Sequence, residues 1–205
     1  MRIHIAIVVT LLLAIGLLVA GGCAKQNQTS GPKPVATEKS PQQTAGQNKK
    51  ILIAYFSHSG NTKAFAEAIQ KHVGGSLWAI EPQVVYPKVY NEVVDQAKGE
   101  VDSKHTPALT AKISNIRDYD IIFIGTPIWW YTIAPPVRTF LSEHDMTDKI
   151  IVPFSTHKGS GLSGIDKTIQ ELQPKAKVME GLAIWDNQAN SKQADIQNWL
   201  RRLNL

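Results

Sequence analysis

The sequence predicts an α/β domain in which helices cover both faces of a five-stranded parallel sheet. From residue 51 onward, short runs of β-branched and other apolar residues alternate with segments of helical periodicity. The run 121–124 is apolar at consecutive positions, as expected for a parallel strand that is buried on both faces. A chain of 205 residues is long enough for one such domain and a small extension.

The elements follow one another in strict alternation. The expected strands are 51–56, 76–80, 121–125, 150–154 and 178–184. The expected helices are 62–73, 90–97, 134–144, 162–172 and 191–203. Because sheets of this type bind ligands at the carboxyl ends of their strands, the segments after the first, third and fourth strands are the candidate site.

The N-terminus resembles a bacterial lipoprotein signal. Arg2 precedes an apolar run over 5–20, and small residues lead to Cys23. The resemblance implies cleavage after residue 22 and acylation of Cys23, although Ala20 stands where such signals usually have Leu. The alternative is a transmembrane anchor with an incidental cysteine. In both cases the domain is tethered to a membrane and extracytoplasmic, in the cell envelope.

Residues 23–49 are expected to form a flexible linker between this anchor and the domain at 50–205. They are rich in Gln, Thr, Ser, Pro and Lys and hold too few large apolar residues to fold. A linker of this length spans at most roughly 90 Å when extended.

The charge distribution argues against a nucleic-acid partner. The chain carries a net charge of +5, and residues 1–50 account for all of it, so residues 51–205 are neutral. They show no basic stripe with interleaved aromatic residues. Since Cys23 is the single cysteine, an internal disulfide and a cysteine-based zinc site are excluded, and we expect no metal site.

The segment after the first expected strand is suited to a phosphate group. It consists of Ser57, His58, Ser59, Gly60, Asn61 and Thr62. Three hydroxyls, the backbone N–H groups and the positive end of the following helix can hold a dianion, and Gly60 permits a tight turn. The alternative is an ordinary turn with a capping hydroxyl. The nucleoside-triphosphate motif G-x-x-x-x-G-K-[ST] is absent from the sequence.

The segment after the third expected strand carries three consecutive aromatic residues. It consists of Thr126, Pro127, Ile128, Trp129, Trp130, Tyr131 and Thr132. Three rings in a row cannot all face one core, so we expect some to be exposed where a flat ligand can stack on them. The alternative is a partly buried cluster or a dimer contact.

The segment after the fourth expected strand is rich in glycine and hydroxyl groups. It consists of Ser155, Thr156, His157, Lys158, Gly159, Ser160 and Gly161. With Gly164 it spells G-x-G-x-x-G, but it lies in the wrong unit of the fold for a dinucleotide fingerprint. We expect a loop that borders a flat ligand, with His157 as a ligand contact, a proton donor or a solvated side chain.

Together these segments are similar to the flavodoxin family. Residues 57–62 resemble its phosphate loop, T/S-x-T/S-G-x-T, and the runs Y-P-x-x-Y at 86–90, P-I-W-W at 127–130 and P-F-S-T-H-K-G-S-G at 153–161 resemble bacterial flavodoxin-like proteins of the short-chain type. The resemblance covers 50–205. It implies a three-layer α/β/α fold with sheet order 2-1-3-4-5, with FMN bound by its phosphate at 57–62 and by its isoalloxazine between the other two segments.

The charge of the three segments favours one reaction class. None contains Asp or Glu, and Lys158 lies where the reduced, anionic flavin is expected, so reduction is less penalised than in an acidic flavodoxin. This favours an FMN-dependent oxidoreductase that reduces a small acceptor such as a quinone. The alternatives are a membrane-tethered electron carrier and a flavin-less binding module. The sequence names neither the electron donor nor the acceptor.

Overall fold

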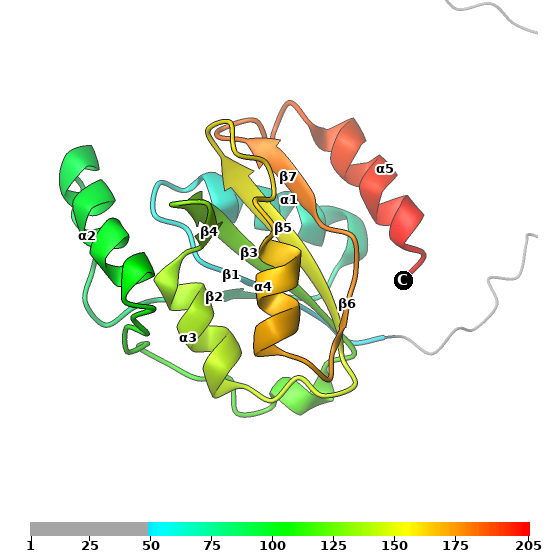
Figure 1. Ribbon diagram of the computed structural model, residues 1–205. Coiled ribbons are helices and arrows are strands. Elements are labelled where there is room, and N and C mark those ends of the chain that lie inside the picture. Colours follow the sequence, from blue (N-terminus) through cyan, green and yellow to red (C-terminus); the bar gives the residue numbers. More distant parts are fainter. Residues whose placement is uncertain (1–48) are drawn as a thin grey trace, which may run out of the picture. The chain divides into compact units, whose positions relative to one another are not determined.

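The structure is a computed structural model that describes residues 49–205, all within one compact unit (Figure 1). The proposed signal peptide, Cys23 and nearly all of the 23–49 linker lie outside the described residues. Within the described part, no helix is long and apolar enough to cross a membrane.

The sheet confirms the expected fold and order. Its strands are β1 (Ile51–Tyr55), β2 (Ser76–Ala79), β3 (Ile121–Trp129), β4 (Thr132–Ile133), β5 (Ile150–His157), β6 (Lys177–Val178) and β7 (Leu182–Trp185). The order is β2-β1-β3-β5-β6, with every pair parallel, and β7 also pairs with β5. β5 is therefore the expected fourth strand, and β6 and β7 together form the fifth. The short β4 is an antiparallel addition to β3.

The fifth strand was expected to run unbroken over 178–184, and the structure shows a break instead. Ile151 pairs with Val178 and Phe154 pairs with Leu182, so the outer strand uses one residue more than β5 over the same stretch, which makes a bulge. The bulge contains Gly181, where an added Cβ would lie 2.9 Å from the Pro153 carbonyl oxygen. A close backbone approach at this glycine and a proline in β5 explain why the ladder is interrupted.

Helices cover both faces of the sheet. They are α1 (Asn61–Val73), α2 (Tyr90–Asp102), the short 3-10 helix η1 (Ile116–Asp118), α3 (Pro135–Glu143), α4 (Ile165–Leu172) and α5 (Gln193–Leu203). Helices α1 and α5 pack on one face, while α3 and α4 pack on the other, as Figure 1 shows.

The consecutive apolar run of β3 divides between the two cores. Ile121 and Phe123 pack with α1 and α5, and Ile122 and Ile124 pack with α3 and α4. All four side chains are buried. Because successive side chains of a strand point to opposite faces, only a strand covered on both faces needs this pattern. The apolar run thus positions the carboxyl end of β3 at the centre of the fold.

Candidate functional site

A pocket of about 670 Å³ lies at the carboxyl end of the sheet, where the sequence predicts the site. Of the predicted residues, those that line it are His58, Ser59, Pro127, Ile128, Trp129, Trp130, Tyr131, Thr156, His157 and Gly159. The remaining predicted residues, which do not line it, are Ser57, Gly60, Asn61, Thr62, Thr126, Thr132, Ser155 and Gly161. A second cleft of about 450 Å³ lies at the opposite end, around Lys50 and Asp118, and holds none of the predicted residues.

The segment 57–62 connects β1 to the N-terminus of α1. Gly60 precedes the helix with φ of 89°, in the left-handed region that favours glycine, and no side chain in the described part of the chain caps the helix by a hydrogen bond. Apart from Gly60 and its two chain neighbours, no heavy atom of residues 49–205 lies within 4 Å of the position that a Gly60 Cβ would take, so the turn is open on that side. The first-turn N–H groups of α1 therefore remain without a capping side chain, and the sequence of this turn has no acidic residue.

An unsatisfied hydroxyl marks the start of the same segment. Ser57 Oγ is buried and has no hydrogen-bond partner among residues 49–205, and Ser155 Oγ at the end of β5 is in the same condition. A buried hydroxyl without a partner costs free energy, so such atoms are uncommon in native proteins unless a ligand or water meets them. Together with the open Gly60 turn, Ser57 fits the phosphate group of a ligand.

Thr62 and Asn61 form contacts that hold the segment in place. Thr62 Oγ1 lies 2.9 Å from Thr156 Oγ1 in a buried hydrogen bond that joins α1 to β5. The Asn61 side-chain amide donates to Ser59 Oγ at 3.0 Å and to Asp186 Oδ1 at 2.5 Å. The segment is therefore connected to both β5 and the chain after β7.

The structure corrects the expectation that residues 126–132 form a loop. β3 continues to Trp129 and turns back through Trp130 and Tyr131 into β4, with Trp129 paired to Thr132. Both turn residues have positive φ, 47° and 62°, which is the geometry of a tight two-residue hairpin. Thr126 is buried beneath the hairpin, and its Oγ1 accepts a hydrogen bond from the Ala134 N–H at 3.0 Å. This threonine supports the hairpin from below.

The three consecutive aromatic rings take three different positions. Trp129 is half-buried and makes edge contacts with Phe56 and Tyr86, at centroid distances of 5.4 and 4.9 Å. Trp130 lies against α2, where its Nε1–H donates to the Val94 carbonyl oxygen at 3.0 Å. Tyr131 is 74% exposed. As expected, the three rings do not share one core, and Tyr131 has the most freedom to contact a ligand.

The segment 155–161 begins as strand and ends as loop, since β5 runs to His157. His157 Nδ1 accepts a hydrogen bond from the Gly159 N–H at 2.9 Å. Burial lowers the pKa of His157 below its ordinary value of 6.5, and the nearby Asp186 carboxylate opposes this effect. A neutral imidazole is thus favoured at the edge of the pocket.

Sequence reasoning missed two parts of the pocket. Asp186, directly after β7, brings a carboxylate into a site that was expected to hold none, and its Oδ2 lies 3.8 Å from Lys158 Nζ. Helix α2 supplies a wall made of Tyr90, Val93, Val94 and Ala97. Asp186 stands at the carboxyl end of a strand, which is the signal that would have identified it; the α2 wall follows a long connection and has no comparable signal.

Tyr86 supports Trp129 from behind. Its ring is buried, and its hydroxyl donates to Glu100 Oε2 at 2.5 Å. Burial, together with the hydrogen bond and charge of Glu100, raises the pKa of Tyr86 far above its ordinary value, so the phenol stays protonated. His58 completes this side, with Nε2 2.8 Å from the Pro87 carbonyl oxygen.

Solved structures of similar fold include flavoproteins. A candidate flavoprotein from Bacteroides eggerthii has a TM-score of 0.68 and 32% identity, covering 77% of this chain and 99% of that one. A flavoprotein from Lactobacillus acidophilus, solved in complex with FMN, has a TM-score of 0.57 and 25% identity, covering 71% of this chain and 99% of that one.

Sequence comparison finds similar enzymes that match part of the chain, and a family that matches residues 50–203. A protein of Rhizobium meliloti named NAD(P)H dehydrogenase (quinone) 3 is 28% identical over 129 residues, or 58% of each chain. A Cupriavidus metallidurans protein named NAD(P)H dehydrogenase (quinone) is 28% identical over 94 residues, or 46% of each. The chain spans about half the length of these curated relatives. The family profile described as Flavodoxin matches residues 50–203, and the chain therefore belongs to the flavodoxin family.

Proposed function

We propose that residues 50–205 bind FMN and pass two electrons from it to a small acceptor such as a quinone. The observation that carries the cofactor assignment is the unsatisfied Ser57 hydroxyl beside the open Gly60 turn at the N-terminus of α1. The FMN-bound relative from Lactobacillus acidophilus supports it. When bound, FMN would supply reversible transfer of electrons.

In this proposal, each side of the pocket has its own task. Residues 57–62 would hold the phosphate, and the hairpin residues 129–131 and the segment 155–161 would contact the isoalloxazine. His157, neutral and at the pocket edge, can accept or return a proton during turnover. The apolar wall of α2 keeps water from one side of the ligand.

The charge of the pocket favours the oxidoreductase over a carrier of very low potential. The charged side chains that line the pocket are Lys158 and Asp186, which form an ion pair. A reduced, anionic flavin therefore meets no net negative charge there. The names of the quinone-reducing relatives are consistent with this choice.

The test begins with flavin binding by the full chain purified in detergent. Flavin fluorescence titration should show saturable binding of FMN, and the prereduced holoprotein should be reoxidised rapidly by a water-soluble quinone. Binding without rapid reoxidation would favour the electron carrier instead. No binding of FMN would favour the flavin-less module and contradict the proposal.

We also propose that the chain is anchored in the cell envelope through a lipid on Cys23. The support is the cysteine's place after a small-residue motif and an apolar run. Cys23→Ser should accumulate as an unprocessed precursor that takes up no labelled fatty acid. Processing at residue 22 in this variant, with acylation retained, would contradict the lipid anchor.

A further inference from the structure

Asp186 occupies a position between two of the segments that form the pocket. Its backbone N–H donates to the His157 carbonyl oxygen at 2.8 Å, which continues the β5–β7 ladder by one residue. One carboxylate oxygen accepts the hydrogen bond from Asn61 Nδ2, and the other lies 3.8 Å from Lys158 Nζ. The Asp186 side chain is 25% exposed, so solvent screens it only in part.

This position places a negative charge next to the proposed phosphate site. Asn61 is the first residue of α1, and its amide also donates to Ser59 Oγ. A dianion at the N-terminus of α1 would therefore lie close to the Asp186 carboxylate, and the two charges repel each other. Lys158 is the cation that faces this carboxylate.

We propose that the Lys158–Asp186 ion pair contributes to the preference of the pocket for the phosphorylated flavin. Lys158 acts through Asp186: it cancels the repulsion between that carboxylate and the phosphate group. This inference rests on the proposed function, namely that FMN binds with its phosphate at residues 57–62. It assigns to Lys158 a role at the phosphate end of the ligand.

The same lysine has a second contact that must be separated from this role. Lys158 Nζ lies 5.0 Å from the centroid of the ring of Tyr90, the first residue of α2, which also lines the pocket. A cation over this ring would affect ligands with and without a phosphate alike. The ratio of the affinities for FMN and riboflavin therefore distinguishes the two roles, because riboflavin lacks the phosphate.

A double-mutant cycle tests the ion pair directly. Dissociation constants for FMN and riboflavin are measured by fluorescence titration of the full chain in detergent for wild type, Lys158→Met, Asp186→Asn and the double variant. Lys158→Met should weaken FMN binding about fivefold and leave riboflavin binding unchanged. Asp186→Asn should strengthen FMN binding, and in its presence Lys158→Met should weaken FMN binding less than it does in the wild type, because the carboxylate no longer holds the ammonium group at this place.

The control makes the same Lys→Met substitution in an ion pair outside the pocket. Lys112 pairs with Glu143 at 3.1 Å and does not line the pocket, so Lys112→Met should change neither dissociation constant. Unchanged riboflavin binding also shows that the variants of the ion pair remain folded.

Three results would overturn the inference. Equal losses of FMN and riboflavin in Lys158→Met would place the role of the lysine at the ring. An undiminished effect of Lys158→Met in the Asp186→Asn background would mean that the lysine contacts the phosphate without the carboxylate. A wild type that binds riboflavin but not FMN, or neither, would overturn the proposed function together with this inference, whereas the first two results leave FMN binding intact.

Discussion

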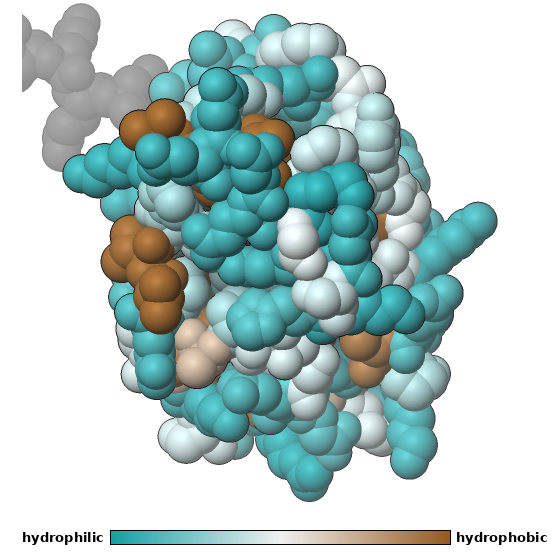
Figure 2. Space-filling model, turned by 60° about the vertical axis from the view of Figure 1, so that its left-hand side comes forward, coloured by the Kyte–Doolittle hydropathy of each residue, from teal (hydrophilic) through white to brown (hydrophobic). Residues whose placement is uncertain are grey.

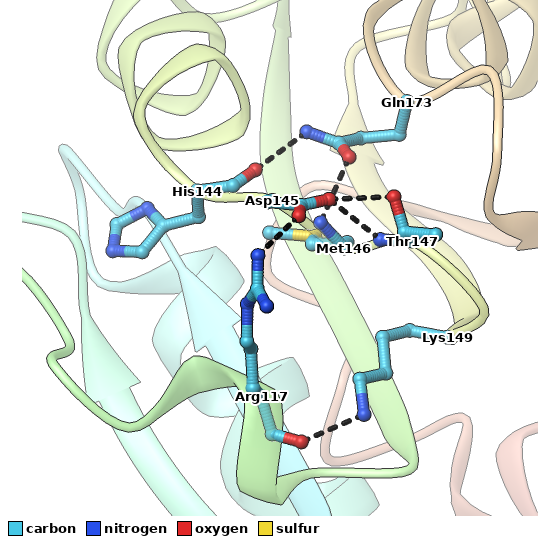
Figure 3. A network of polar contacts seen from close by, with 7 residues as sticks. All are labelled: Arg117, His144, Asp145, Met146, Thr147, Lys149 and Gln173. Carbon is cyan, nitrogen blue, oxygen red and sulfur yellow. Dashed lines mark hydrogen bonds and ion pairs between the residues drawn. The ribbon is translucent and has the colours of Figure 1, made fainter.

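The two ends of the sheet differ in how completely their buried polar atoms are hydrogen-bonded. At the amino end, the corner formed by Arg117, residues 144–147, Lys149 and Gln173 is linked by a dense set of polar contacts (Figure 3). At the carboxyl end, Ser57 Oγ and Ser155 Oγ are buried without partners in the described residues. Satisfied buried groups stabilise a fold, whereas unsatisfied ones cost stability and remain available to a ligand.

Gln173 shows how completely the amino-end corner is satisfied. Its Nε2 donates to the carbonyl oxygens of Leu141 and His144, and its Oε1 accepts from the Met146 N–H. His144 is buried as well: its Nδ1 donates to the Phe140 carbonyl oxygen at 2.7 Å and its Nε2 accepts from the Ile113 N–H at 3.2 Å. Both ring nitrogens of His144 therefore have a hydrogen-bond partner.

The outer part of the corner is ionic. Arg117 pairs with Asp145 at 2.6 Å, and the Thr147 side chain and N–H both donate to the same carboxylate. The hydrogen bonds from Thr147, followed by the charge of Arg117, lower the pKa of Asp145. The pocket end, in contrast, presents a surface that is partly apolar; around α2, apolar spots interrupt a mainly hydrophilic surface (Figure 2).

The largest expected effect comes from breaking the satisfied corner. Gln173→Leu keeps the volume but leaves two carbonyl groups and one N–H unpaired, so the free energy of unfolding should fall by about 3 kcal/mol. Urea unfolding of the flavin-free chain measures it, and the FMN dissociation constant should not change. Gln70→Leu, which loses a single exposed bond to the Gly75 carbonyl oxygen, is the control and should cost less than about 1 kcal/mol. Equal losses in the two variants would contradict the difference between a satisfied and an exposed contact.

The opposite result is expected at the pocket. Ser57→Ala removes a hydroxyl that has no partner in the described residues, so the stability of the flavin-free chain should stay the same or rise. A hydrogen bond to a charged acceptor is worth about 1.5 to 3 kcal/mol, so FMN should bind roughly ten- to hundredfold more weakly. Riboflavin binding should barely change. Thr62→Ala, which also breaks the buried bond to Thr156, should lose both stability and FMN affinity.

The fold and the position of the pocket could be predicted from the sequence, but the local geometry of the hairpin could not. The fold and the three site segments could be predicted from the hydrophobic periodicity and from the rule that ligands bind at the carboxyl ends of strands. Both rules apply here because the apolar runs of β1, β3 and β5 can only be buried as central strands with helices on both faces. The hairpin at Trp130 and Tyr131 could not be predicted, since its turn uses two large residues with positive φ in place of the usual Asn-Gly.

Asp186 and the amino-end corner escaped prediction for another reason. The bulge at Gly181 shifts the fifth strand, so its carboxyl end lies beyond the expected 178–184. Asp186, the first residue after the strand, therefore fell outside the segments that were considered. Gln173 and His144 lie 29 residues apart, and their contact depends on how α3 and α4 pack together. Neither carries a local pattern, so tertiary packing alone brings them together.

A substitution in the hairpin should have an intermediate effect, on both stability and flavin binding. Tyr131 has φ of 62°, where a residue with a Cβ is strained, and its side chain is 74% exposed. Tyr131→Gly should therefore raise the free energy of unfolding of the flavin-free chain by about 0.5 to 1 kcal/mol. If Tyr131 stacks on the flavin, FMN and riboflavin should both bind about fivefold more weakly. Tyr131→Ala should lose the same affinity without the gain in stability. An equal gain in stability in Tyr131→Ala would show that relief of backbone strain does not cause the gain in Tyr131→Gly.

The smallest expected effect is a pH dependence that belongs to the pocket end. Burial holds the pKa of His157 below 6.5, so the folded chain disfavours the protonated imidazole, and protonation at Nδ1 would also remove the acceptor for the Gly159 N–H. Above about pH 6.5 both folded and unfolded states hold a neutral imidazole, and stability is unaffected. As the pH falls below this value, the unfolded chain binds the proton first, so stability declines until the folded-state pKa is reached.

Urea unfolding at pH 7.5, 6.5 and 5.5 should therefore show a smaller decline for His157→Asn, whose amide oxygen can still accept from Gly159 and does not titrate. The other histidines are common to both proteins and cancel in the difference, and Asp186→Asn should make the decline steeper because it removes the carboxylate that favours the proton. Identical pH profiles in wild type and His157→Asn would show that the imidazole is solvated, and the pocket end would then contribute nothing to the pH dependence of folding.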